Sequence, residues 1–593
     1  MMVTIVLVSA AILLVAYLVY GRILVRLLRV DGRDQTPAYA LQDDVDYVPL
    51  DRGPLMAQHF SAIAAAGPIV GPILAGAMFG WLPALLWILA GSIFIGGVHD
   101  FTSLMASVRH RGLSIAEVVR QHMSHRSVIL FLVFIWFALV YIIVAFTDIT
   151  ASSFIGAQEL GNGDVVTGAG IASSSLMYLA LPIVMGLLVR YTRLTMGWAT
   201  IIFLPLVGLA IWGGQYVPFD VAKWLQQSSP SLTATEANVQ AHKLWDVALL
   251  TYCAIASIVP MWLLLQPRGQ LGGVFLYAAL ASGALGLLIG GQPINLPAYT
   301  GWTSASGQTL APMLFITIAC GACSGFHALI ASGTTSKQIR TEVDARSIGY
   351  GTMLLEAMVA IISLCCVMMV IPGSELHTKS PNFIYASGIG NFLETVSIPR
   401  ALGVSFALMA FTTFVYDTLD VCARLGRYVI QELTGWHDAR GKWLGTGITV
   451  AAPLFFILQE SVDKNGNPVP IWLTFWGLFG ASNQLLAALT LLGVTVWLWR
   501  TRRAKWVWYV TGLPTLFMFA MSNWALVTII RDAVQKGEAK SPVTIVAGLL
   551  VVLAVLMLLE AVAVLARTFG SPPTGKPDAP ARTPSDGLLP RPT

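Results

Sequence analysis

Charged side chains are scarce in this sequence. Asp, Glu, Lys and Arg make up 11% of its 593 residues, against about a quarter in soluble domains. Hydrophobic residues reach 56%, and the mean hydropathy is +0.73. A chain with so little charge cannot cover a soluble surface, and no polar stretch is long enough for a soluble domain of useful size. The composition therefore predicts an all-α polytopic membrane protein embedded in the lipid bilayer.

A basic folded domain is also missing, so a nucleic-acid partner has no surface on which to bind. The net charge of +5 comes instead from short loops. If the N-terminus lies outside, most of the 35 lysines and arginines fall on one side of the membrane, and short loops rich in these residues stay cytoplasmic. We expect a multi-pass protein with its N-terminus outside and its C-terminus in the cytoplasm.

Cysteine is rare, and all six cysteines lie within or at the end of apolar segments, which argues against a secreted disulfide framework. They are Cys253, Cys320, Cys323, Cys365, Cys366 and Cys422. The Cys320-x-x-Cys323 spacing is that of a redox motif. Its neighbours are small residues in an apolar segment, so close helix packing is the favoured interpretation.

About fifteen apolar segments approach the ~20 residues that a helix needs to cross the bilayer core. They are 3–20, 58–79, 81–98, 127–146, 170–189, 197–213, 245–265, 271–290, 310–331, 349–371, 399–418, 444–458, 471–498, 504–530 and 543–566. Residues 1–57 are expected to hold the first helix and a cytoplasmic segment. The Pro-rich stretch 567–593 has few large apolar residues and is expected to be a disordered cytoplasmic tail.

Two Gly-Pro pairs, Gly67-Pro68 and Gly71-Pro72, interrupt the segment 58–79. A spanning helix must satisfy its own backbone hydrogen bonds, so unwound chain at mid-depth persists only where it is buried in protein or lines a cavity. Discontinuous helices mark binding sites in secondary transporters. A kink in a tightly packed helix is the alternative. We favour a discontinuous helix at a transport site.

The interruption also predicts which ligands bind there. If a half-helix begins near Pro72, the free amides that start at Ile73 and the positive dipole end favour a carboxylate. The carbonyl groups of Ala65 and Ala66 suit a cation instead. The residues expected at the substrate are Gly67, Pro68, Gly71, Pro72, Ile73 and Ser324.

Ionisable residues at membrane depth are few, and each is costly enough to mark a pathway or a relay. His327 can carry a proton near neutral pH, although a neutral histidine that joins two helices is an equal alternative. Glu356 has no cation within one helical turn and is the better acidic candidate for coupling. We expect the coupling ion, a proton or sodium, at His327 and Glu356, with Ala65 and Ala66 as further ligands. The hydroxyl of Ser324 could equally coordinate a cation or cap a backbone turn.

Five further residues are expected to gate the pathway near its cytoplasmic side. They are His59, Asp100, Arg268, Asp420 and Arg424. Asp420 and Arg424 stand four residues apart on one helical face, so an ion pair between them is favoured over proton transfer.

The order of the segments permits an inverted repeat. Residues 58–213 and 245–418 each supply five crossings that begin on opposite sides, as inverted-topology halves require. The first helix of each half carries a breaker, Pro68 with Pro72 in one and Pro260 in the other. Residues 444–566 would then form additional transmembrane helices.

Four stretches carry a family resemblance. His59–Pro72, Ile258–Arg268, Ala319–Lys337 and Leu478–Ala487 closely resemble, in this order, signatures of the carbon starvation protein A (CstA) family. That family is placed in the amino acid-polyamine-organocation superfamily, which implies a LeuT-like five-plus-five inverted-repeat core. Members are described as bacterial inner-membrane transporters of peptides or pyruvate in the response to carbon starvation, with proton symport in the pyruvate carriers.

Three departures limit what the resemblance carries over. Gly269 stands where members often have Asp after a Pro-Arg pair, and His99 stands where they often have Gln. The region from Pro372 to Arg400 is short relative to longer members, so a substrate preference set by outer loops does not transfer.

These observations together predict a secondary-active symporter for a carboxylate, either a peptide or pyruvate. They predict no enzyme activity, no cofactor and no metal. Three alternatives stay open: a channel without coupled accumulation, a nutrient sensor, and a membrane enzyme built on Cys320, Cys323 and His327. The oligomeric state is not indicated.

Overall fold

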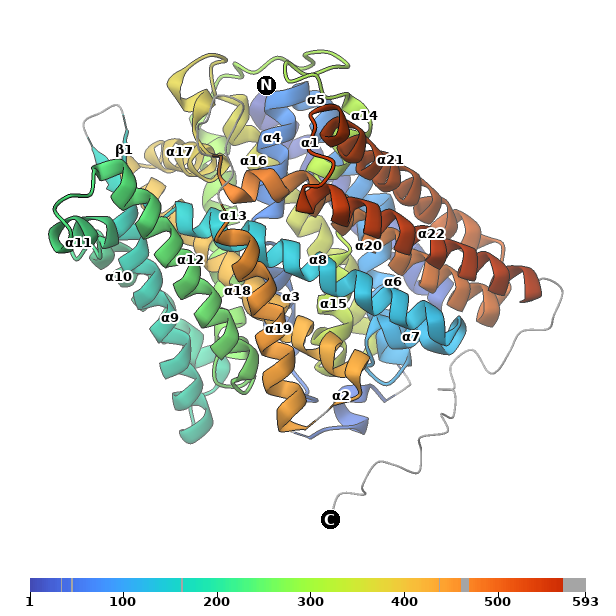
Figure 1. The fold of residues 1–593 in the computed structure, drawn as a ribbon. Coiled ribbons are helices and arrows are strands. Elements are labelled where there is room, and N and C mark those ends of the chain that lie inside the picture. Colours follow the sequence, from blue (N-terminus) through green and yellow to red (C-terminus); the bar gives the residue numbers. More distant parts are fainter. Residues whose placement is uncertain (33–34, 44–45, 161–163, 437, 460–468, 569–593) are drawn as a thin grey trace.

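The computed structural model describes residues 1–32, 35–43, 46–160, 164–436, 438–459 and 469–568. Almost all of the expected C-terminal tail, 567–593, lies outside this part of the chain. Helices make up most of the described structure (Figure 1).

The described residues in the first half of the chain form thirteen α-helices, one π-helical turn and a short hairpin. These are α1 (Met2–Leu28), α2 (Pro37–Ala40), α3 (Arg52–Ile63), α4 (Gly67–Phe79), α5 (Trp81–Gly91), η1 (Ser92–Gly96), α6 (Gly97–Arg109), α7 (Ile115–His122), α8 (His125–Ser152), β1 (Ala157–Glu159), β2 (Val165–Thr167), α9 (Gly168–Tyr191), α10 (Met196–Gly214), α11 (Val221–Ser228), α12 (Ala234–Ile258) and α13 (Leu265–Gly290). Strands β1 and β2 pair antiparallel, with Gln158 opposite Val166.

The second half continues the helical pattern. Its elements are α14 (Leu310–Thr317), α15 (Phe326–Gly333), η2 (Thr335–Lys337), η3 (Glu342–Asp344), η4 (Arg346–Gly351), α16 (Thr352–Met368), η5 (Glu375–Thr378), α17 (Pro381–Glu394), α18 (Arg400–Thr434), α19 (Ala439–Ile457), α20 (Ile471–Arg502), η6 (Trp508–Gly512), α21 (Leu513–Gln535) and α22 (Pro542–Thr568).

Every apolar segment expected from the sequence overlaps a helix, but fewer of them qualify as membrane spans. Among the described residues, 11 helices are long and apolar enough to cross a membrane, or up to 12 if the bent pair α3 and α4 counts as one span. The segments 245–265, 310–331 and 444–458 do not qualify. The reason is that α12 and α19 begin with charged residues and 310–331 is divided between two short helices.

The first interruption lies earlier than expected. Helix α3 ends at Ile63 and α4 begins at Gly67, with a bend of 45° between them. Pro68 stands in the first turn of α4, where a proline removes only an amide that has no helical partner in any case. Pro72 lies inside the same helix. The expectation that a half-helix begins near Pro72 is therefore wrong, and the non-helical stretch is Ala64–Ala66.

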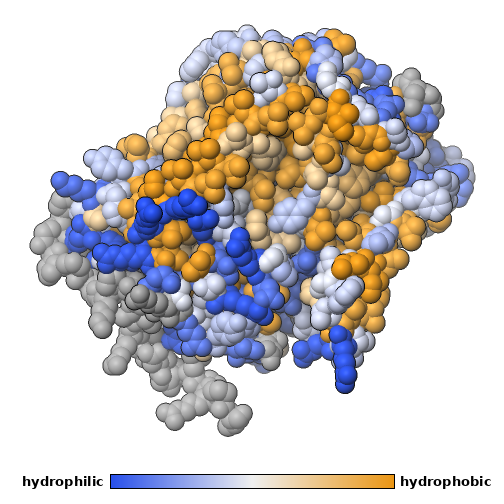
Figure 2. Space-filling model, turned by 180° about the vertical axis from the view of Figure 1, so that it is seen from behind, coloured by the Kyte–Doolittle hydropathy of each residue, from blue (hydrophilic) through white to orange (hydrophobic). Residues whose placement is uncertain are grey.

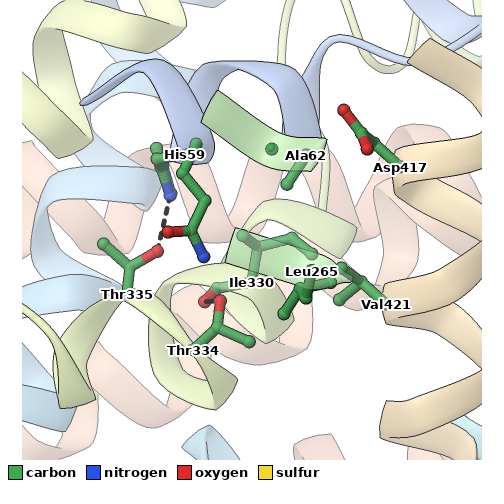
Figure 3. Close-up of a pocket in the computed structure, with 10 residues that line it drawn as sticks. His59, Ala62, Leu265, Ile330, Thr334, Thr335, Asp417 and Val421 are labelled. Atoms are coloured by element: carbon green, nitrogen blue, oxygen red, sulfur yellow. Dashed lines mark hydrogen bonds between the residues drawn. The ribbon is translucent and has the colours of Figure 1, made fainter. Parts of the chain in front are cut away.

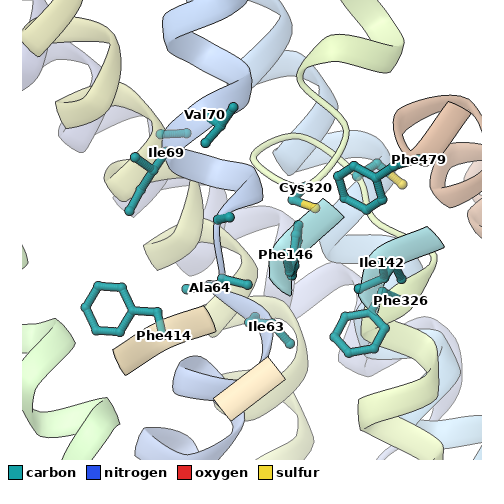
Figure 4. Packing of buried hydrophobic residues seen from close by; sticks show 14 of the residues in the cluster. Ile63, Ala64, Ile69, Val70, Ile142, Phe146, Cys320, Phe326, Phe414 and Phe479 are labelled. Atoms are coloured by element: carbon teal, nitrogen blue, oxygen red, sulfur yellow. The ribbon is translucent and has the colours of Figure 1, made fainter. Parts of the chain in front are cut away.

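A second interruption was not expected. The segment 310–331 is not one helix, since α14 ends at Thr317 and α15 begins at Phe326. The connecting residues 318–325 include both cysteines of the Cys320-x-x-Cys323 motif, so these cysteines do not lie within a helix. Figure 4 shows the two interruptions, with Ala64 and Cys320 labelled.

The bundle is organised around these interrupted helices. Helix α4 packs against α16, α6 packs against α15, and α3 packs against α13. Helix α8 crosses the centre of the bundle against α18 and α20 (Figure 1), and the apolar stretch of α20 is buried along its whole length. Apolar residues cover most of the middle of the face in Figure 2, and hydrophilic residues gather toward its lower edge. This distribution fits a protein that spans a membrane.

Candidate functional site

His327 lies in the first turn of α15 and contacts two carboxylates. Its Nδ1 lies 2.8 Å from Asp100 Oδ2 on α6. Its Nε2 lies 3.2 Å from Glu356 Oε2 on α16. A second histidine, His99, places its Nδ1 2.7 Å from the other oxygen of Asp100. All four side chains are fully buried.

The charge of this cluster depends on how many protons it binds. Two buried carboxylates without a cation would carry two negative charges away from water, which is strongly unfavourable. A protonated His327 between them offsets one charge, and a further proton on a carboxyl group removes the other. The number of protons bound by the cluster therefore affects how favourably α6, α15 and α16 pack together.

The sequence had assigned these residues to different roles. Asp100 was expected at a gate and His327 with Glu356 at the coupling site, yet the structure brings all three together. Glu356 indeed has no cation on its own helix. Its partner comes from α15, which only the fold places beside it.

The start of α15 is held by a single residue of α20, Asn483. Its Oδ1 accepts hydrogen bonds from the Phe326 amide at 3.0 Å and the Ser324 hydroxyl at 3.2 Å. Its backbone carbonyl accepts from the Gly325 amide at 3.1 Å, and its Nδ2 contacts Cys320 Sγ at 3.3 Å. Asn483 thus supplies partners that an interrupted helix lacks.

The two interrupted helices touch each other through glycines of α4. A Cβ at Gly67 would lie 2.3 Å from Cys320 Sγ, and one at Gly71 would lie 2.4 Å from the Thr317 carbonyl oxygen. Both positions therefore require glycine. Ile73 lies in the second turn of α4, so the expected free amides from Ile73 to Ala75 are part of the helix. The amides of Ile69 and Val70 bond to the Ala66 carbonyl at 3.1 and 2.8 Å.

A second polar cluster surrounds Arg268, a fully buried residue of α13. Its Nε lies 2.5 Å from Asp417 Oδ1, and its guanidinium also contacts Asp420 and the Tyr252 hydroxyl. The same hydroxyl donates to Asp420 Oδ2 at 2.9 Å. The Ser61 hydroxyl on α3 donates to Asp417. These contacts join α3, α12, α13 and α18.

The expected ion pair between Asp420 and Arg424 is not formed. Asp420 contacts Arg268 instead. Arg424 donates to the carbonyl oxygens of Ala256 and Val259 at 2.8 and 2.6 Å. These carbonyls lie at the C-terminal end of α12, where unpaired carbonyl groups and the helix dipole favour a cation.

A small cavity borders the Arg268 cluster through Asp417 (Figure 3). Its lining includes Gln58, His59, Thr334, Thr335 and Asp417. His59 Nδ1 lies 2.8 Å from Thr335 Oγ1. Among the described residues, His59 Nε2 and Gln58 Oε1 have no hydrogen-bond partner. The volume of about 10 Å³ is enough for about one water molecule, so this cavity does not admit a larger ligand.

Known proteins resemble this chain over most of its length. Residues 1–384 and 374–525 match the family described as Carbon starvation protein CstA. Peptide transporter CstA of Campylobacter jejuni is 30% identical over 593 residues, which cover 89% of this chain and 79% of the relative. Pyruvate/proton symporter BtsT of Escherichia coli K12 is 30% identical over 605 residues, which cover 88% of this chain and 81% of the relative.

Among solved structures, the manganese transporter of Eremococcus coleocola is similar with a TM-score of 0.45 and 13% identity, over 89% of this chain and 99% of that one. The family match, in contrast, spans far more than half of the chain. The protein therefore belongs to the carbon starvation protein CstA family.

Proposed function

We propose that this protein takes up a small carboxylate, pyruvate or a peptide, by proton symport across the bacterial inner membrane in the response to carbon starvation. Its relatives are named as a peptide transporter and a pyruvate/proton symporter. The observation that supports proton coupling most directly is the position of His327 between Asp100 and Glu356, with all three side chains buried.

The coupling step follows from the charge of the cluster. His327 and Glu356 bind the proton while the site is open to one side, and Asp100 holds the imidazole in place from α6. Release requires water to reach the cluster from the other side, because an unprotonated cluster would leave two carboxylates unpaired in a dry site. The same movement of α15 would open and close the substrate site beside it.

We also propose a LeuT-like five-plus-five core with boundaries different from those expected from the sequence. The first half consists of α3 with α4, α5 with α6, α8, α12 and α13. The second half consists of α14 with α15, α16, α18, α19 and α20. In this assignment each half begins with an interrupted helix. Helix α4 of the first half corresponds to α15 of the second half, and α6 corresponds to α16. The contact of α4 with α16 is therefore the counterpart of the contact of α15 with α6.

The hairpin of α9 and α10 is then an insertion in the first half, and α17 is an insertion in the second. Helices α1, α21 and α22 lie outside the core. The halves become 52–290 and 310–502 instead of 58–213 and 245–418. Under the positive-inside rule, the end of the bundle with α2 and η2 faces the cytoplasm and the N-terminus faces outward.

The substrate carboxylate is proposed to bind between the two interruptions, at Gly67 and Pro68 of α4 and Ser324 before α15. The positive dipole end of α4 supports an anion there. Since Gly67 packs against Cys320, α4 and α15 must separate before a substrate enters. If the coupling ion is sodium, the carbonyl group of Ala65 would be a ligand, whereas that of Ala66 already accepts hydrogen bonds from the amides of Ile69 and Val70.

The gate is proposed at the Arg268 cluster and the neighbouring small cavity. Arg268 joins α13 to Asp417 and Asp420 of α18, His59 joins α3 to Thr335, and Arg424 fixes the end of α12. Opening toward the cytoplasm must break some of these contacts, because the cavity holds only about one water.

The test is uptake into proteoliposomes of labelled pyruvate and a labelled dipeptide, driven first by a proton gradient and then by a sodium gradient, with protein-free vesicles as control. We expect accumulation of one substrate under the proton gradient and its collapse with an uncoupler. His327→Gln should lose accumulation yet keep exchange of labelled for unlabelled substrate. His377→Gln, on η5, is the matched control.

Three outcomes contradict the proposal in different ways. Proton-driven accumulation in His327→Gln at the wild-type level would remove His327 from the coupling step. Flux that never exceeds the equilibrium level would indicate a channel. Binding of substrate without transport would indicate a sensor.

Uptake that persists in Cys320→Ser and Cys323→Ser would argue against an enzyme built on these thiols.

A further inference from the structure

A third buried polar cluster shares no residue with the proposed proton and substrate sites. It consists of Asp148 near the end of α8 and of His242 and Asp246 on α12. Asp148 and Asp246 are 3% and 2% exposed, whereas the His242 side chain is 25% exposed. The cluster is therefore buried on one side and reached by solvent through the imidazole.

The three side chains present one nitrogen and two oxygen atoms to a common point. His242 Nε2 lies 3.3 Å from Asp148 Oδ1 and 3.9 Å from Asp246 Oδ2, and one ligand atom from each residue lies within 4.8 Å of the others. Bonds of about 2.0–2.2 Å to a tetrahedral ion place its ligands roughly 3.3–3.6 Å apart. Small side-chain rotations bring these atoms to that spacing.

One ligand is already oriented and another lacks a partner. The backbone amide of Trp472, on α20, donates to Asp148 Oδ2 at 2.8 Å, which leaves Oδ1 turned toward His242. This is the outer hydrogen bond that fixes many metal-binding carboxylates. Asp246 Oδ1 is buried and has no hydrogen-bond partner among the described residues. Two buried carboxylates this close repel each other unless a cation lies between them, and the group that faces both of them is the His242 imidazole.

We propose that Asp148, His242 and Asp246 form a binding site for a divalent transition metal of the zinc class. An imidazole nitrogen with two carboxylates suits Zn²⁺ and Co²⁺, whereas Mg²⁺ and Ca²⁺ require more oxygen ligands and Na⁺ gains nothing from imidazole. Three protein ligands would leave the fourth position of a tetrahedral ion to water. Metal binding replaces the hydrogen bond from His242 Nε2 to the Asp148 carbonyl, at 3.1 Å, and releases that proton.

The bound metal would strengthen the link between two helices that already meet through His242 and Asp148. Asp148 belongs to α8 and the other two ligands to α12, and α20 contacts the same carboxylate. If α8 and α12 move relative to each other during transport, the metal holds them in one arrangement and inhibits uptake. This consequence rests on the proposed function, whereas the metal site itself does not.

The binding test uses the full-length protein in detergent with any affinity tag removed, dialysed against micromolar Zn²⁺ in excess Mg²⁺. We expect one zinc per chain, and Asp246→Asn and His242→Gln should each weaken binding about tenfold or more. His377→Gln should bind zinc as the wild type does. Gel filtration of each variant shows whether it is folded. Co²⁺ added to the wild type gives a visible absorption band from the same ligands and needs no variant.

Wild-type protein that retains no zinc and shows no cobalt band would overturn the proposal. Zinc that is retained equally by both ligand variants would overturn it as well, because the metal would then lie elsewhere. For the transport arm, zinc should inhibit substrate exchange by the wild type and not by Asp246→Asn. Zinc binding without inhibition would keep the site and remove its regulatory role, independently of whether the protein is a symporter.

Discussion

His327 Nδ1 lies 2.8 Å from Asp100 Oδ2, although 227 positions separate the two residues in the chain. The contact joins α15, the second half of an interrupted helix, to α6 at a point that water does not reach. Any movement of α15 must therefore break this contact or carry α6 with it. The protonation of one side chain and the position of a helix are linked by a single pair of residues.

Replacing Asp100 by Asn should destabilise the protein strongly. The change leaves His99 and His327 without the carboxylate that both contact, and breaking a buried ion pair costs about 3–5 kcal/mol. The measurement is the apparent melting temperature in detergent. Asp51→Asn is the control, because Asp51 pairs with Arg340 at the surface, where a pair contributes about 1 kcal/mol or less. Equal melting temperatures for the two variants would show that the Asp100 pair is not needed for stability.

Replacing Arg268 by Met should also destabilise the protein, by a comparable amount of about 3–5 kcal/mol. Asp417 and Asp420 would lose the buried cation that they share. Adding Asp417→Asn and Asp420→Asn to the Met variant should restore part of the melting temperature, since neutral amides do not repel each other. A triple variant that is less stable than Arg268→Met would contradict this account.

The sequence shows which ionisable residues lie in apolar segments more readily than it shows how they pair. His327 and Glu356 stood out because each is isolated in an apolar segment. Asp100 and Arg268 are expected at gates from their position near the cytoplasmic side. Their partners could not be predicted, because these lie on helices far away in the chain. The i,i+4 rule predicted the wrong partner for Asp420, because tertiary contacts offered Arg268 to the carboxylate and helix-end carbonyls to Arg424.

The two interruptions differ in how visible they are from sequence. The Gly67-Pro68 pair indicated the first interruption. The start of the second half-helix was expected too late in the chain, because proline is tolerated in the first turn of a helix. The second interruption, at 318–325, contains no proline. Its signal was the run of small residues around Cys320 and Cys323, which was interpreted as close packing. Asn483, which holds that stretch, could be expected only to join helices.

Replacing Gly67 by Ala should disturb the contact between the two interruptions. The added Cβ would lie 2.3 Å from Cys320 Sγ, and overpacking of this kind costs about 1–3 kcal/mol. Cys320→Gly in the same chain should recover part of the loss. Gly208→Ala on α10 is the control, because nothing lies within 4 Å of its Cβ position. The measurement is melting temperature together with uptake, and a Gly67→Ala variant that matches Gly208→Ala would rule out the close contact.

Replacing Asn483 by Ala should loosen α15 without changing any side chain of the cluster formed by Asp100, His327 and Glu356. The variant loses the acceptor for the Phe326 amide and the Ser324 hydroxyl, and each buried polar group left without a partner costs about 1–3 kcal/mol. Because His327 follows directly after this turn, uptake should fall with stability. Asn523→Ala is the matched control, since the Asn523 side chain donates only to Phe519 of its own helix. Hydrogen exchange should locate the loosening at the start of α15; if the amides of residues 324–328 stay protected in Asn483→Ala, another contact holds the interruption.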